Sequence, residues 1–326
     1  MYMSMDRRSA LKTFGALSAG GAVSALAGWA SLRFSQQRSA RRRALRVAHL
    51  TDVHVHPSGN SMSGLAACLR HVQSHGRPDV ILQGGDAILD GMAYDDVEVS
   101  GQWDAWKTVW HNEDHAPIEH CLGNHDLWGG KTKGGKATNE DRTYAKQWAM
   151  EQYGLLERYR GFDLGGWHFV VLDSVLPAGD GYRARLDDEQ FEWLAAELAA
   201  TPRNTPILIL SHIPILSACA FFDGDNEKTN DWVVPGAWMH LDARKLRDLF
   251  AQHPNVKLCL SGHIHLQDCV CYQGVTYLCN GAVSGNWWRG AYQGCEPGYG
   301  LIDLYDDGTF EHEYVAYRAG IGLRGF

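Results

Sequence analysis

Nine short apolar runs recur along the sequence, and five of them lead directly into Asp, His or Asn. Several are rich in Val, Ile and Leu without polar alternation, which is typical of strands covered on both faces. The runs are Leu45–Leu50, Asp79–Gln83, Ile118–Leu122, His168–Leu172, Pro206–Leu210, Val256–Leu260, Val275–Leu278, Gly300–Tyr305 and Phe310–Tyr317. Helix-like stretches between them are Ser63–His75, Gly101–Asn112, Asn139–Tyr153, Asp187–Ala200 and Asp242–Gln252. This alternation predicts an α/β sandwich with its helices outside, and the last strands, which lack helices between them, favour an antiparallel edge.

The polar residues after the runs have the chemistry of metal ligands. They occur in Thr51-Asp52-Val53-His54, Gly84-Gly85-Asp86, Gly123-Asn124-His125-Asp126, Ser211-His212 and Ser261-Gly262-His263-Ile264-His265. Open α/β sheets bind ligands at the carboxyl ends of their strands. Carboxylate, imidazole and amide donors without a thiolate suit Mn, Fe or Zn. A single histidine after a strand is usually a hydrogen-bonded structural residue, but the ordered set of five segments predicts a metal centre.

This set resembles the calcineurin-like metallophosphoesterases, whose pattern is D-x-H, then GD, then GNH followed by D or E, then H, then GH-x-H. The resemblance spans about residues 45–268. It implies a four-layer α/β/β/α sandwich with mixed sheets and two metal ions, each Mn, Fe or Zn. It implies that one ion is held by Asp52, His54, Asp86 and His265. It implies that the second is held by Asp86, Asn124, His212 and His263, so that Asp86 bridges the pair.

The same resemblance implies hydrolysis of phosphate mono- or diesters at the metal pair. His125 would then be the histidine beside the scissile phosphate, where it stabilises the transition state and protonates the leaving group. Asp126 or another carboxylate would orient His125, and the sequence leaves that choice open. His125 and Asp126 are the predicted catalytic residues.

The residue three positions after Asp86 helps to distinguish among the subgroups of these metallophosphoesterases. Purple acid phosphatases carry Tyr three residues after the Asp of the GD motif, and the Ser/Thr phosphatases carry Asp there, whereas this chain has Leu89. The short body and the Gly-Asn-His-Asp and Gly-His-Ile-His motifs are more similar to bacterial class III cyclic nucleotide phosphodiesterases. Two alternatives remain: a metal-binding scaffold of the same fold without catalysis, and a two-metal hydrolase of a non-phosphate bond.

Charge separates the N-terminal segment from the rest of the chain. Residues 1–43 hold eight Lys or Arg and one acid, while the remaining residues carry 22 basic and 37 acidic side chains, a net charge of −15. A body this acidic repels a long polyanion, which argues against wrapping nucleic acid. A small phosphate ester remains a suitable substrate because bound cations reverse the local charge.

Residues 1–43 resemble a twin-arginine (Tat) signal peptide followed by a basic linker. Arg7-Arg8 precede a Gly- and Ala-rich apolar run from about Phe14 to Leu32, the order expected of an export signal. Asp6 and Ala10 depart from the usual signal pattern. We therefore predict interaction with the Tat machinery, a periplasmic or extracellular location, and one phosphoesterase domain over residues 44–326. An uncleaved membrane anchor is the alternative, because the apolar run is nearly long enough to span a bilayer.

Three loops are candidates for substrate contacts: Trp128–Thr138, Phe221–Trp238 and Ala282–Pro297. The last contains Trp287, Trp288 and Arg289, and an aromatic pair there could stack a base, contact a lipid or glycan, or simply pack. The cysteines show no C-x₂-C pair of the kind that a zinc ribbon requires. Cys121 and Cys259 lie within apolar runs and are expected to be buried thiols.

Overall fold

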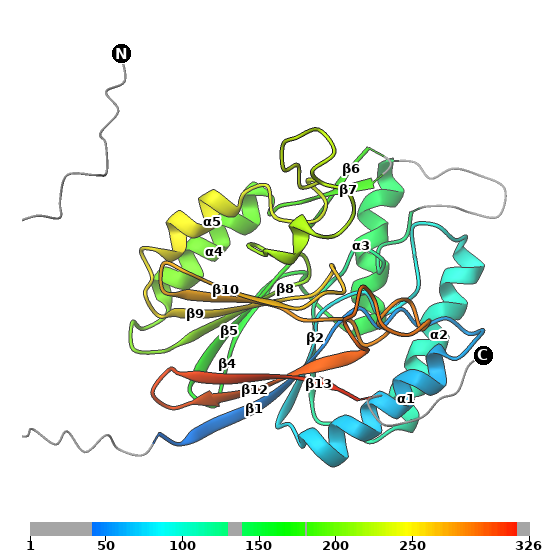
Figure 1. Cartoon of the computed structure of the whole chain (residues 1–326), viewed down its shortest axis with the longest axis horizontal. Helices are drawn as coiled ribbons and strands as arrows, with labels where there is room; N and C mark the ends of the chain where they lie inside the picture. Colours follow the sequence, from blue (N-terminus) through cyan, green and yellow to red (C-terminus); the bar gives the residue numbers. More distant parts are fainter. Residues whose placement is uncertain (1–40, 130–138, 180, 318–326) are drawn as a thin grey trace, which may run out of the picture. The chain divides into compact units, whose positions relative to one another are not determined.

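The computed structural model describes residues 41–129, 139–179 and 181–317, and within them two mixed β-sheets lie between layers of helix (Figure 1). The first sheet has the strand order β13-β12-β1-β2-β3, and the second has β10-β11-β9-β8-β5-β4. In the first sheet β1, β2 and β3 are parallel, whereas β12 and β13 are antiparallel. In the second sheet β11, β9, β8 and β5 are parallel, and antiparallel β10 and β4 form its edges. The predicted mixed-sheet fold is confirmed, including its antiparallel edge.

The element bounds follow from these pairings. The strands of the first sheet are β1 (Arg43–Leu50), β2 (Val80–Gln83), β3 (Ile118–His120), β12 (Gly298–Tyr305) and β13 (Phe310–Ala316). Those of the second sheet are β4 (Arg160–Leu164), β5 (Trp167–Leu172), β8 (Ile207–Ser211), β9 (Val256–Ser261), β10 (Asp268–Tyr272) and β11 (Val275–Cys279). The helices are α1 (Ser61–His71) with a π-turn over Val72–Gly76, α2 (Asp96–Asn112), α3 (Asn139–Tyr153), α4 (Asp188–Ala200), the 3₁₀ turn η2 (Cys219–Phe221) and α5 (Ala243–Phe250). A separate hairpin is formed by β6 (Val175–Ala178) and β7 (Gly181–Ala184).

Alternating side chains on the central strands fill three apolar layers. Val47 on β1 packs in a cluster between the two sheets, together with Leu208 on β8. The next residue, Ala48, faces the other way, into the cluster that contains Trp103 of α2. On the second sheet, Ile209 belongs to a third cluster, with residues of α4 and α5. Each central strand therefore buries both faces, which explains the uninterrupted apolar runs.

Helix α2 begins five residues before the predicted start at Gly101. Asp95 caps it: the carboxylate accepts hydrogen bonds from the backbone amides of Val97 and Glu98, and the Glu98 side chain accepts one from the Asp95 amide. This capping box extends the helix across a first turn that has little apolar periodicity. The prediction from apolar spacing missed that turn because its residues face solvent.

The predicted signal segment lies outside the described residues apart from positions 41–43, and β1 already begins at Arg43. In the described part of the chain, no helix combines the length and the apolar character needed to cross a bilayer. All eight cysteines fall in described segments, where no disulfide joins them, and Cys121 and Cys259 are buried as expected.

Burial of histidine predicts that the fold loses stability in mild acid. Burial, reinforced by Arg160 and His115, lowers the pKa of His120 to about 3, while the same side chain titrates near 6.5 in the unfolded chain. The unfolded state therefore binds the extra proton as pH falls below 6.5, so this residue opposes folding by about 3 kcal/mol at pH 4.5. We expect His120→Phe to reduce the number of protons taken up on unfolding by about one, so that the free energy of unfolding depends less on pH. Urea titrations between pH 7 and pH 4.5 measure this dependence. An unchanged slope would contradict this assignment.

Candidate metal centre

The five polar segments meet where the parallel strands of both sheets end. The structure brings the seven predicted ligands together from loops after β1, β2 and β3 of the first sheet and after β8 and β9 of the second: Asp52, His54, Asp86, Asn124, His212, His263 and His265. The two sheets are joined directly at this edge. The His263 backbone amide donates to both Asp52 carboxylate oxygens, at 2.9 and 3.1 Å.

Their donor atoms form two adjacent groups. One group contains Asp52, His54 and His265, and the other contains Asp86, His212 and His263, with the donor atoms of each group within 4.8 Å of one another. Asp86 joins the two, because its Oδ2 lies 3.2 Å from His212 Nε2 and 3.8 Å from His54 Nε2. In the second group, Asn124 Oδ1 lies 3.0 Å from His212 Nε2. This is the arrangement expected for two cations that share one carboxylate.

Backbone carbonyls orient the imidazoles so that acceptor nitrogens face the centre. His212 Nδ1 lies 2.8 Å from the Gly84 carbonyl, and His265 Nδ1 lies 2.7 Å from the Gly285 carbonyl. Donation from Nδ1 to a carbonyl leaves the Nε2 lone pair of each ring directed inward. The Nε2 atoms of His54 and His265 lie only 3.1 Å apart. Two converging nitrogen acceptors beside carboxylates fit a bound transition-metal ion.

Five of the seven predicted ligands adopt left-handed backbone conformations, with φ values of 55° at Asp52, 51° at His54, 55° at Asp86, 71° at His263 and 60° at His265. Non-glycine residues rarely adopt this conformation, which costs about 1–3 kcal/mol each. After β1 and β9 the chain turns sharply enough to direct two side chains each at the same point. Neighbouring glycines make the approach close: a Cβ at Gly123 would overlap the Asp86 carboxylate, and one at Gly262 would overlap that of Asp52.

Burial and mutual charge set the protonation of the ligands. Burial, together with neighbouring imidazoles, lowers the pKa values of His54 and His263 to about 3. Burial opposes protonation of His212 as well, but the Asp86 carboxylate outweighs it and raises the His212 pKa to about 9. Burial favours a neutral Asp86, yet His212 and His125 hold its pKa well below the usual value. Asp86 is thus ionised at the bridging position, where its charge attracts positive charge beside it.

His125 lies at the mouth of this centre. Its ring packs edge-on against the His54 ring at a centroid distance of 4.8 Å. Its backbone amide donates to Asp86 Oδ1 at 2.8 Å, which fixes the other oxygen of that carboxylate toward the imidazoles. A ring nitrogen of His125 also comes within 4.8 Å of donor atoms of His54 and Asp86. Geometry therefore permits His125 either to bind a cation or to face the substrate.

The carboxylate beside the His125 ring is Asp90, whose Oδ2 lies 3.6 Å from His125 Nδ1. Asp126 is turned elsewhere: it accepts hydrogen bonds from the amides of Asp86, Ala87 and Gly123 and from the Tyr153 hydroxyl. The sequence left open whether Asp126 or another carboxylate orients His125, and this geometry favours Asp90. Asp126 instead holds together the two loops that present Asp86 and Asn124.

Two further aromatic residues border the ligands and were not assigned from the sequence. The Trp288 indole nitrogen donates to the His54 carbonyl at 3.0 Å. Tyr182 of β7 lies edge-on to His263, with ring centroids 6.2 Å apart. Tyr182 comes from a hairpin that apolar runs did not predict. For Trp288, the only signal was its place in a Trp-rich loop.

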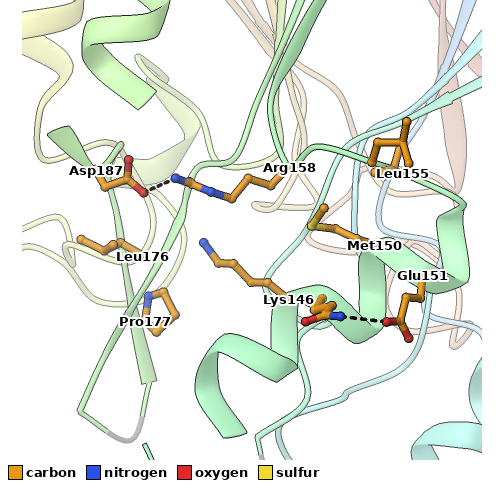
Figure 2. Close-up of a pocket in the computed structure, with 10 residues that line it drawn as sticks. Lys146, Met150, Glu151, Leu155, Arg158, Leu176, Pro177 and Asp187 are labelled. Carbon is orange, nitrogen blue, oxygen red and sulfur yellow. Dashed lines mark hydrogen bonds and ion pairs between the residues drawn. The ribbon is translucent and has the colours of Figure 1, made fainter. Parts of the chain in front are cut away.

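A separate cavity of about 650 Å³ lies between α3, β6 and the start of α4. Figure 2 shows Lys146 and Arg158 pointing into the same space, near Leu176 and Asp187. Both cations are already paired: Lys146 and Arg158 contact the buried Asp173 carboxylate at 2.6 and 3.1 Å, and Arg158 contacts Asp187 at 2.7 Å. The cavity is therefore lined by a structural ion-pair network.

Removing Arg158 from that network is expected to destabilise the protein. Asp173 is fully buried, so Arg158→Met leaves its carboxylate with Lys146 as the remaining cation and should lower the free energy of unfolding by about 1–3 kcal/mol. Lys228→Met removes an exposed pair with Asp225 and should have no measurable effect. Urea unfolding of the two variants tests this, and equal stability would show that the network contributes little.

Comparisons with known proteins agree with this geometry. Residues 45–267 match the calcineurin-like phosphoesterase family. A 3′,5′-cyclic-nucleotide phosphodiesterase of Nostoc sp. is 27% identical over 284 residues, which cover 81% of this chain and 89% of that protein. The 3′,5′-cyclic adenosine monophosphate phosphodiesterase of Escherichia coli K12 is 26% identical over 182 residues, covering 54% of this chain and 60% of that enzyme. A dimetal phosphatase structure from Danio rerio has a TM-score of 0.61 at 13% identity and covers 85% of this chain and 97% of its own.

The chain belongs to the calcineurin-like phosphoesterase family. This confirms the predicted family and the predicted class of enzyme, a phosphoesterase. The structural similarity confirms the four-layer fold.

Proposed function

We propose that this protein is an exported, two-metal phosphodiesterase that hydrolyses cyclic nucleotides. The observation that carries the proposal is the pair of donor groups joined through Asp86, with His125 beside them. The family match supports phosphoester hydrolysis. The similarity to a cyclic-nucleotide phosphodiesterase over 81% of the chain supports a cyclic diester as the substrate.

In this proposal Asp52, His54 and His265 would hold one cation, Asn124, His212 and His263 would hold the second, and Asp86 would contribute to both sites. The donor set suits Mn, Fe or Zn. Bound cations would supply the Lewis acidity that polarises the phosphoryl oxygens and activates water. The protein's own residues position the ligands: Asp126 holds the backbone amide of Asp86, and the carbonyls of Gly84 and Gly285 hold two imidazoles.

His125 is proposed to stabilise the developing charge and to donate a proton to the leaving oxygen. The ring lines the cleft next to His54, where an ester leaving group would lie. Asp90 is proposed to position the ring through its contact with Nδ1. With Nδ1 held in this way, Nε2 is the nitrogen available for proton transfer.

A substrate panel tests the function. Purified protein should hydrolyse 3′,5′-cyclic AMP only after loading with Mn²⁺, Fe²⁺ or Zn²⁺, and a chelator should abolish turnover. A monoester and a non-phosphate ester serve as comparisons. Turnover of the monoester alone would make the protein a phosphatase. Bound metal without turnover of any phosphoester would favour the scaffold alternative.

Export through the Tat pathway is part of the proposal and is supported by Arg7-Arg8 and the apolar run that follows. Tat cargo folds before translocation, so the metals would be loaded in the cytoplasm. Replacing both arginines with lysine should retain the protein in the cytoplasm, as judged by cell fractionation. Recovery of the unaltered protein in the cytosol alone would remove export from the proposal, and recovery in the membrane fraction would favour an uncleaved anchor.

A further inference from the structure

A cleft of about 570 Å³ opens beside the metal centre, and its lining includes His54 and His125. Three segments supply the rest of the lining: residues 56–61 before and at the start of α1, residues 89–94 before α2, and Trp287–Arg289. This volume is within the range of small-molecule sites. A substrate phosphate at the metal centre would leave the rest of the molecule in this cleft.

The two adjacent tryptophans of the cleft have different roles. Trp288 is buried, at 8% exposure, and its indole nitrogen is bonded to the His54 carbonyl. Trp287 is half-buried and packs beside the ligands, with its ring centroid 4.5 Å from that of His265 and 5.7 Å from that of His54. Tyr292 meets the Trp287 ring edge-on, at 5.8 Å and 89°. Trp288 therefore anchors the loop, while Trp287 offers an aromatic surface to the cleft.

The position of Trp287 is fixed before any ligand arrives. Both tryptophans have left-handed backbones, with φ of 46° and 68°, and a bridge between Gly285 and Gly290 closes the loop around them. Such strain persists only where the surroundings hold it in place. Because the Trp287 ring is already held in place, it loses little conformational freedom when a ligand stacks on it. More of the energy of that contact therefore contributes to affinity.

The remaining lining favours a polar, anionic, aromatic ligand over an acyl chain. Arg289 is exposed and makes no ion pair with the described residues, so it adds unpaired positive charge beside the cleft of an acidic protein. The His56 and Tyr94 rings, 6.0 Å apart, line another part of it. Asn60 and Ser58 add hydrogen-bonding groups of the kind that bind base edges. Ser58 and Asn60 already have partners in His56 Nδ1 and the Trp288 carbonyl, but an acyl chain would give the Arg289 guanidinium no partner.

We propose that this cleft is a nucleobase subsite in which the base of the substrate stacks on Trp287 while its phosphate occupies the metal centre. The inference rests on the proposed function and assigns to this cleft the recognition of the substrate's base. Stacking of a base on an aromatic side chain contributes about 1–3 kcal/mol, a roughly 5- to 150-fold change in affinity.

The experiment compares two phosphate ligands that differ by a base. Mn²⁺-loaded protein is titrated calorimetrically with 5′-AMP and with ribose 5-phosphate. Wild type should bind 5′-AMP roughly 5- to 150-fold more tightly. Trp287→Leu keeps an apolar side chain but removes the ring, and should reduce this ratio toward one. Trp287→Phe keeps a ring and should preserve most of the ratio. Trp232→Leu, at an exposed tryptophan outside the cleft lining, is the matched control and should change nothing.

Metal content and thermal unfolding are measured for each variant, because Trp287 touches the ring of a proposed ligand. Equal affinity of the wild type for both ligands, or an unchanged ratio in Trp287→Leu, overturns the subsite. Failure of 5′-AMP to bind loaded wild type also overturns it. A base-dependent ratio without hydrolysis of cyclic AMP retains the subsite and rejects the proposed reaction. Hydrolysis of cyclic AMP together with equal affinity for 5′-AMP and ribose 5-phosphate retains the proposed reaction and rejects the subsite.

Discussion

Asp86→Asn is expected to lower kcat/KM on a phosphodiester by at least about 10³-fold and to reduce the bound metal below two ions per chain. Asp86 lies between the two donor groups, with Oδ2 within 3.8 Å of imidazoles in both. Asparagine is isosteric, tolerates the left-handed backbone, and can still accept the His125 amide hydrogen bond through Oδ1. The loss therefore reports the missing negative charge, and elemental analysis with steady-state kinetics measures both effects.

The control for this substitution is Asp104→Asn, which removes a carboxylate that is 70% exposed on α2 and paired with Lys107. It should leave metal content and kinetics unchanged. If Asp86→Asn keeps two metals and near-normal turnover, Asp86 does not bridge and the two-cation interpretation is wrong.

His125→Ala is expected to lower kcat about 10²- to 10⁴-fold with full metal content. The physical reason is loss of the proton that His125 would donate to the leaving oxygen. An ester whose leaving group is p-nitrophenolate needs little protonation, so its hydrolysis should suffer much less. Kinetics on both kinds of ester, with metal analysis, separate a proton donor from a ligand.

His111→Ala is the matched control, because that histidine is exposed at the end of α2. Loss of metal in His125→Ala would identify His125 as a ligand, which its approach to His54 and Asp86 permits. An equal loss on both esters would remove the proton-donor role while retaining charge stabilisation.

The central strands and the polar residues that follow them could be predicted because both depend on local patterns. A strand buried on both faces must be apolar throughout, and its end can be recognised from the polar residues that follow. This is how Asp52, His54 and Asp86 could be expected at one sheet edge. The antiparallel β12 and β13 followed from the absence of a helix between them.

Contacts that depend on long-range geometry could not be predicted. Asp126 precedes no recognisable element, and only the folded chain shows its carboxylate holding the Asp86 and Gly123 amides. Asp90 reaches His125 across 35 positions of sequence. The left-handed conformation at Asp52 and His263 could not be predicted from the residues found there. Glycine is the residue that usually marks such a conformation in a sequence.

The pairing of β1 with β12 has a consequence for biosynthesis. Arg43 is in register with Tyr305, so the first strand lacks this neighbour until the ribosome has translated residue 305. The final donors, His263 and His265, are also translated late, and they meet Asp52 only across the two sheets. A nascent fragment that ends before residue 263 therefore lacks two of the predicted donors and cannot assemble the cation site.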